Sequence, residues 1–191
     1  MGRRRTFDPI EAVRSSRAVF WRQGFEASSL SDLEDATGLN RSSLYHEFGS
    51  KRGLFDAAAD SYLDEVARPR LRVLTHKPIP PDAVGMYLRS LRDALLVNAS
   101  AASEHGCLIV NTAGSLIGKD EAVRDRIVAY RTEIATAIEN GLTHQPGFDS
   151  SRVKPTATAI TSLVVAAMTL TRVDPTAAAQ TLDIAVVLTN G

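Results

Sequence analysis

Apolar residues in this chain recur at intervals of three and four positions, and this spacing constrains the fold more than any other feature. The clearest run contains Val123, Ile127, Tyr130, Ile134, Ile138 and Leu142. Such spacing marks one face of an α-helix, whereas a half-buried strand alternates every second residue. Period-two runs of valine and isoleucine are absent from the sequence. The pattern therefore predicts an all-α protein.

Capping residues mark the starts of four helices in the first third of the chain. A Ser, Asp or Asn before a helix accepts a hydrogen bond from an amide that the helix leaves unpaired, and a Gly supplies the left-handed turn that ends it. On these signals we predict helices over about 9–23, 29–38, 40–48 and 51–66 or beyond, with Pro69 bending or ending the last.

The segment 76–82 carries three prolines, which stop helices and mark a boundary. We predict an N-terminal domain at 1–55, with a helix-turn-helix at about 29–48, and a C-terminal helical bundle at 56–191. Within the bundle we predict helices around the apolar stripe 87–95, over 105–117 and over 120–145, followed by 155–172 and 175–189.

The last two predicted helices consist largely of Ala, Thr, Val, Leu and Ile and carry little charge. This composition indicates burial on more than one face, and obligate dimer interfaces resemble a protein core cut in half. We therefore predict a homodimer that forms through these two helices. An ordinary intramolecular core explains much of the same pattern and stays open as an alternative.

Sites for metal, disulfide and common enzyme chemistry are not apparent. Cys107 is the single cysteine, so no intramolecular disulfide can form, and the four histidines lack the spacing of zinc ligands. His46-Glu47 begins a zincin-like pattern, but Ser50 stands where the second histidine is needed. Gly49-Ser50-Lys51 lacks the glycines of a phosphate-binding loop. We predict no metal, no cofactor and no enzymatic activity.

The longest unbroken apolar run, residues 163–168, is too short to span a bilayer, and the basic start of the chain is followed by no apolar stretch. These features predict a soluble, cytoplasmic protein without a membrane partner.

Charge alone does not decide whether nucleic acid is a partner. The chain has 22 basic and 22 acidic residues, and residues 1–55 hold nine basic and seven acidic side chains, a net of +2. This excess of positive charge is small, so a nucleic-acid function can be inferred only from where individual side chains lie.

Two short predicted helices joined at Gly38-Leu39 have the arrangement of a helix-turn-helix. The second would bury Leu44 and Phe48, one turn apart, and leave its polar side chains for another surface. Arginine pairs with a guanine edge, and hydroxyl groups reach phosphates. A solvated helix face is the alternative. The candidate DNA-binding residues are Ser29, Asn40, Arg41, Ser42, Ser43, Tyr45, His46 and Lys51.

The stretch from about Phe7 to Val66, which includes FWRQGFEASSLSDLEDATGLNRSSLYHEFGSKRGLF, resembles the DNA-binding domain of the TetR/AcrR family of transcriptional regulators and covers about a third of the chain. Its most specific parts are FxxxGF at 20–25, TGL at 37–39, SLY at 43–45 and FGSKxxLF at 48–55. One departure is Glu34, where many members place a small apolar residue against the recognition helix. A locally rotated or solvent-open contact is the expected consequence.

The segments GCLIVNTAGSL and DEAVRDRI resemble, more loosely, the ligand-binding domain of one branch of that family. The resemblance implies an Ω-shaped homodimer whose two recognition helices enter successive major grooves of a palindromic operator in double-stranded DNA. It also implies release from DNA when a small-molecule effector occupies the C-terminal bundle, and hence a repressor. The sequence does not show whether the protein represses or activates transcription. It also does not identify the effector or the operator sequence. A protein-interaction module without DNA affinity and an enzyme using the C-terminal cavity are the competing functions.

An effector pocket is mostly apolar with a few polar groups. Core packing is the alternative role for each candidate residue, and Cys107 could be a sensor or a small buried side chain. The basic residues Arg3–Arg5 could form a minor-groove arm or a solubilising terminus. The candidate effector-binding residues are Tyr62, Tyr87, Leu91, Cys107, Asn111, Tyr130 and Met168.

Overall fold

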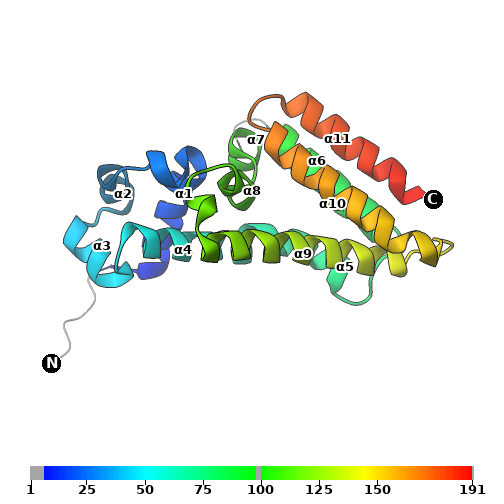
Figure 1. Cartoon of the computed structure of the whole chain (residues 1–191), viewed down its shortest axis with the longest axis horizontal. Coiled ribbons are helices and arrows are strands. Elements are labelled where there is room, and N and C mark those ends of the chain that lie inside the picture. The colour runs from blue at the N-terminus through cyan, green and yellow to red at the C-terminus, as the bar shows by residue number, and fades with distance from the viewer. Residues whose placement is uncertain (1–6, 98–99, 191) are drawn as a thin grey trace.

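The computed structural model describes residues 7–97 and 100–190, and every element in these ranges is a helix (Figure 1). The predicted all-α class is confirmed. Arg3–Arg5 lie outside the described residues. The molecule is elongated, with the first three helices at one end and the last two at the other.

The N-terminal end contains α1 (Pro9–Ala27), α2 (Leu30–Thr37), α3 (Arg41–Phe48) and α4 (Lys51–Tyr62). Gly24 interrupts α1 with a φ of +81°, at the position where the sequence predicted its end. Capping residues begin α2, α3 and α4, because Ser29, Asn40 and Ser50 each accept a hydrogen bond from an amide in the first turn of the following helix.

An aromatic cluster holds this end together. The Phe55 ring of α4 meets the Phe20 and Phe25 rings of α1 edge to face, with centroid distances of 5.3 and 5.2 Å. Leu33 of α2 and Leu44 of α3 are also fully buried in the core. Burial of these large apolar side chains fixes α2 and α3 on the α1–α4 pair.

The path from α4 continues through a π-helical turn, η1 (Leu63–Ala67), into α5 (Arg68–Thr75). Pro69 has no amide to donate, so a regular α-helix would lose one hydrogen bond here. In the wider turn the Arg68 amide donates to the Leu63 carbonyl instead. Pro69 therefore does not end the helical path, which runs on to Thr75.

The C-terminal end is a bundle of long helices: α6 (Ala83–Leu96), α9 (Glu121–Thr143), α10 (Val153–Leu170) and α11 (Pro175–Val187). Helix α11 packs on α6 and α10, α10 also packs on α9, and α5 packs on α6 and α9. The apolar stripe of α9 faces this core, and Asp120 caps its first turn as predicted. Short helical turns η2 (Ile117–Lys119), η3 (Ser150–Arg152) and η4 (Leu188–Asn190) complete the described chain.

The predicted continuous helix over 105–117 is wrong. Two short helices, α7 (Ala101–His105) and α8 (Leu108–Ala113), replace it, with Gly106 between them at a φ of +65°. A Cβ at Gly106 would lie 2.5 Å from the Met168 carbonyl oxygen, so α10 approaches too closely for any side chain. The chain therefore turns at this glycine, and a positive φ there favours glycine over every other residue.

By length and composition, one segment of the described residues, Ser150–Leu170, is apolar enough to cross a membrane. Its Ile160, Val164 and Ala167 side chains are completely buried. The segment packs between α9 and α11, as a core helix of a helical bundle does.

Candidate DNA interface and effector core

Helix α3 turns one narrow apolar side inward and its polar side chains outward. Leu44 is 1% exposed, and Phe48 packs partly buried against the same core. The exposed candidate side chains on α3 are those of Arg41, Ser42 and His46, and the partly exposed ones are those of Ser43 and Tyr45. The predicted division of this helix into a buried and a free face is therefore confirmed, whereas contact with DNA stays a prediction.

The Arg41 guanidinium lies 5.2 Å from the centre of the Tyr45 ring, close enough for a cation–π contact. This contact orients the arginine without using its hydrogen-bond donors. Those donors make no hydrogen bond with any residue in the described ranges, so they can reach an acceptor such as a guanine edge or a phosphate.

Glu34 of α2 joins α2 to the recognition helix directly. Its carboxylate accepts a hydrogen bond from the Arg41 amide, one of the amides that the first turn of α3 leaves unpaired. This hydrogen bond is exposed to solvent, as expected for a solvent-open contact at Glu34, and no described contact tests the expected rotation. The longer polar side chain reaches the end of α3 and supplies a capping interaction that also fixes the angle between the two helices.

Three candidate DNA contacts lie at helix starts. The Ser29 hydroxyl accepts from the Asp32 amide at 3.0 Å, and the Asn40 side chain accepts from the Ser43 amide at 2.9 Å. Both side chains therefore act as caps in this structure. The Lys51 ammonium, at the start of α4, lies 4.6 Å from the centre of the Phe25 ring.

Contacts between the two ends of the molecule fix α1 against the bundle. The Trp21 indole nitrogen donates to the Gly106 carbonyl at 3.0 Å, and the Trp21 ring meets Tyr62 edge to face at 4.9 Å. Arg17 pairs with Glu65 at 2.8 Å. A movement of Gly106 or Tyr62 would therefore also displace α1, which contacts both residues through Trp21.

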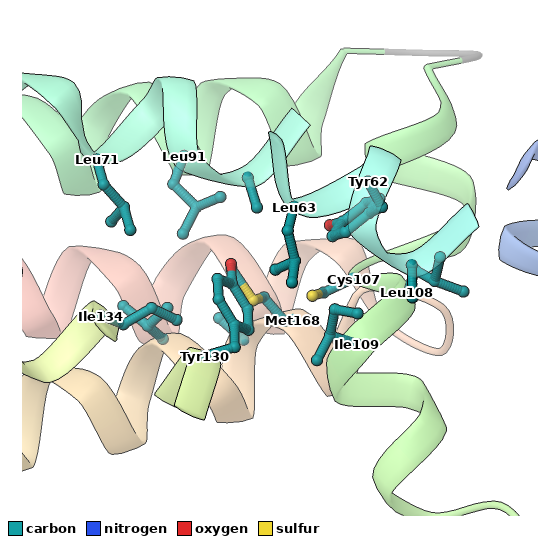
Figure 2. Packing of buried hydrophobic residues seen from close by; sticks show 14 of the residues in the cluster. Tyr62, Leu63, Leu71, Leu91, Cys107, Leu108, Ile109, Tyr130, Ile134 and Met168 are labelled. Atoms are coloured by element: carbon teal, nitrogen blue, oxygen red, sulfur yellow. The ribbon is translucent and has the colours of Figure 1, made fainter. Parts of the chain in front are cut away.

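Side chains predicted to bind an effector converge in the bundle. Tyr62, Leu91 and Met168 line one narrow cavity of about 30 Å³, together with Tyr87, Cys107 and Tyr130. Figure 2 shows the Cys107 sulfur facing the same space as Tyr62, Tyr130 and Met168. Six of the seven candidates are thus brought together from α4, α6, α9, α10 and the residue before α8.

Asn111 is the exception, because it does not line this cavity. Its side-chain amide donates to the His105 carbonyl at 2.6 Å and ties α8 to the end of α7. The sequence reasoning also missed Trp21 and Arg70, which both line the cavity. Trp21 belongs to the predicted DNA-binding domain, and no periodicity in the sequence indicates that its ring reaches the bundle.

Burial keeps the thiol and phenol groups of this cavity neutral. Burial raises the pKa of the Cys107 thiol, although hydrogen bonds from Tyr62 and Tyr130 act in the opposite direction. Burial also raises the pKa of Tyr62, Tyr87 and Tyr130, and the nearby Cys107 adds to each shift. At neutral pH the cavity therefore presents phenol and thiol hydrogen-bond donors and no thiolate.

Residues 13–58 match the family model described as bacterial regulatory proteins of the tetR family. The chain is 31% identical to the HTH-type transcriptional regulator YezE of Bacillus subtilis over 146 residues, which are 74% of this chain and 72% of YezE. This chain belongs to the TetR family.

Other TetR-family relatives are also named as regulators. The chain is 32% identical to the HTH-type transcriptional repressor ComR of Escherichia coli over 60% of this chain and 54% of ComR. It is 30% identical to the repressor BdcR of the same species over 72% of this chain and 66% of BdcR. The aligned parts thus span about half to two thirds of these two relatives.

The fold agrees with solved TetR-family structures. A cysteine mutant of the regulator CifR, solved with 26-base-pair operator DNA, superposes with a TM-score of 0.80 and 27% identity. That superposition covers 97% of this chain and 98% of CifR. A TetR-family regulator from Streptomyces coelicolor shares the fold, with a TM-score of 0.79 over 94% of this chain and 93% of its own length at 17% identity.

Proposed function

We propose that this TetR-family chain is a homodimeric, cytoplasmic repressor that binds a palindromic DNA operator through α3 and leaves it when an effector occupies the bundle. The observation that carries the DNA-binding part is the free polar face of α3 on a helix locked by Leu44 and Glu34. The operator-bound CifR structure and the names of ComR and BdcR support the same function.

Binding to a palindromic operator requires two copies of α3, which a dimer supplies. We place the dimer interface on the outer face of α10 and α11. Ile184 and Val187 of α11 are 58% and 67% exposed, although both are large and apolar. Small residues on α10, including Ala159, Ala166 and Thr169, are also exposed. Such a face is compatible with close packing against a second copy, where it would form a four-helix contact.

Placing charge on this face should break the dimer. We expect the double variant Ile184→Glu, Val187→Glu to sediment as a monomer near 20.6 kDa, while the unchanged chain sediments as a dimer. Two buried carboxylates without partners oppose association strongly. Val128 of α9 is 57% exposed, so Val128→Glu is the matched control and should stay dimeric. A monomeric unchanged chain at micromolar concentration would remove this interface from the proposal.

Effector control needs a physical link from the core to α3, and the α4–η1–α5 path supplies one. Helix α4 packs against α1 and α3, and the middle of the path lines the cavity through Tyr62 and Ala67. A ligand that widens this part of the bundle would shift α4 and change the spacing of the two recognition helices. Release then requires only that the ligand binds more tightly to the DNA-incompatible spacing.

This function is tested by footprinting the dimer on a DNA fragment that it selects from its own genome. We expect two protected half-sites related by a two-fold axis, as a symmetric dimer requires. Protection of a single site, or a footprint unchanged in the monomeric Ile184→Glu, Val187→Glu variant, would contradict the dimeric mode of binding.

A further inference from the structure

Arg70 stands where two hollows of the bundle meet. The inner one is the narrow cavity described above, and the outer one is a surface groove of about 560 Å³ beside α5 and α6. Val66, Arg70 and Tyr87 line both hollows. A molecule that enters from solvent therefore meets these three side chains before it reaches the inner cavity.

Arg70 makes no hydrogen bond and no ion pair with any residue that the structure describes. Arg70 is half-buried, as Arg17 is, but Arg14 and Arg17 both pair with Glu65 whereas Arg70 has no such partner among the described residues. A partly desolvated guanidinium without a counter-ion is unfavourable, and it presents a planar set of donors that fits a carboxylate.

Tyr87 supplies a second unused donor at the same point. Its side chain is only 3% exposed, yet its hydroxyl has no hydrogen-bond partner among the described residues. Tyr87 also lies close enough to Arg70 for the guanidinium to act on its hydroxyl electrostatically. Two side chains with unused donors, one of them cationic, therefore line both hollows.

The residues that line the two hollows supply no carboxylate to pair with Arg70. The residues that line the inner cavity include no aspartate or glutamate. The outer groove has one carboxylate, Glu65, whose oxygens already accept hydrogen bonds from Arg14 and Arg17. Apolar side chains of Val66, Val73 and Met86 form much of the remaining groove wall.

We propose that the effector of this regulator is an organic carboxylate, with its anionic group on Arg70 and Tyr87 and its apolar body along Val66, Val73 and Met86. This inference rests on the proposed effector-controlled function and names the class of effector. The groove volume lies in the range of small-molecule sites. Val66 belongs to the π-helical turn that joins α4 to α5, so the ligand contacts the path toward the recognition helix directly.

The test is calorimetric titration of the full-length protein, without DNA, using phenylacetate, 4-phenylbutyrate and octanoate. Each carboxylate is compared with its own amide and with an amine that carries the same apolar body. We expect at least one carboxylate to bind and its amide and amine to bind about tenfold more weakly or not at all, because the charge-assisted contact is lost. Binding by none of the three carboxylates, or equal binding by an amide, would overturn the proposal.

Variants locate the site. Arg70→Gln should remove the preference for the carboxylate over its amide, and Arg70→Lys should retain part of that preference. Tyr87→Phe should weaken binding of the carboxylate but not binding of the amide or the amine. Arg72 is an exposed arginine on the same helix that lines neither hollow, so Arg72→Gln should bind like the unchanged protein. A preference that survives in Arg70→Gln would contradict the assignment of Arg70, provided that the variant unfolds at the same temperature.

Because the titration contains no DNA, its outcome is independent of the proposed DNA function. Sequence-specific DNA binding combined with no carboxylate binding would reject the effector class and leave the regulator intact. Carboxylate binding by a protein that selects no DNA site would reject the regulator and leave the ligand site intact.

Discussion

Replacing Arg41 with alanine should weaken binding to the operator by about 1–3 kcal/mol for each half-site and relax the base preference at the contacted position. The expectation follows from the exposed guanidinium at the first turn of α3, where it rests on Tyr45 and keeps its donors free. Fluorescence anisotropy on the operator and on single-base variants measures both effects. Tyr45→Ala should also weaken binding, because it removes a hydroxyl and the support of Arg41.

A phosphate contact gives a different signature and serves as the comparison. Lys51→Ala should weaken binding to all sequences alike and lower the slope of log affinity against log salt by about one. All three side chains are at least partly exposed, so thermal unfolding of each variant should match that of the unchanged protein. Unchanged DNA binding in both Arg41→Ala and Tyr45→Ala would show that α3 is not the recognition helix.

A large loss of stability is expected from truncating Phe55 in the aromatic cluster. Phe55→Ala should lower the free energy of unfolding by about 3–5 kcal/mol, which combines lost apolar burial with the cavity left behind. The side chain is 1% exposed and meets two other aromatic rings, so the surroundings cannot relax easily into the space. Urea unfolding followed by circular dichroism gives the value.

Phe148 provides the matched control for this substitution. It lies partly exposed in the loop before η3, where its ring is 6.0 Å from the Arg152 guanidinium. Phe148→Ala should therefore cost much less than Phe55→Ala. Equal losses in the two variants would contradict the view that the aromatic cluster between α1 and α4 is the main support of the N-terminal end.

Local sequence signals were sufficient for most helices. The α9 stripe and the caps of Ser29, Asn40 and Ser50 are governed by residues within one or two turns, so they can be read without knowledge of the fold. The break at Gly106 could not be read in this way. It depends on the approach of the Met168 carbonyl, which is 62 positions away along the chain.

The two candidate sites differ in the same way: one depends on local sequence signals and the other on long-range packing. The free face of α3 follows from helical geometry within eight residues, so the sequence predicted it. The effector core is built by long-range packing: Trp21 reaches it from α1, and Arg70 reaches it from beyond the π-helical turn. The loss of the Pro69 hydrogen bond is a local signal for an irregular helix, but it does not indicate which side chains the irregular turn places at the cavity.

The central claim is that this chain recognises a specific DNA sequence as a dimer. The direct measurement is to incubate the purified protein with fragmented genomic DNA at near-physiological salt, recover the bound fragments and sequence them, since specificity over competing DNA is the defining quantity. The account predicts enrichment of a short palindrome that is lost in Arg41→Ala. Recovery of genomic fragments without any shared sequence, by a folded and dimeric protein, would contradict it.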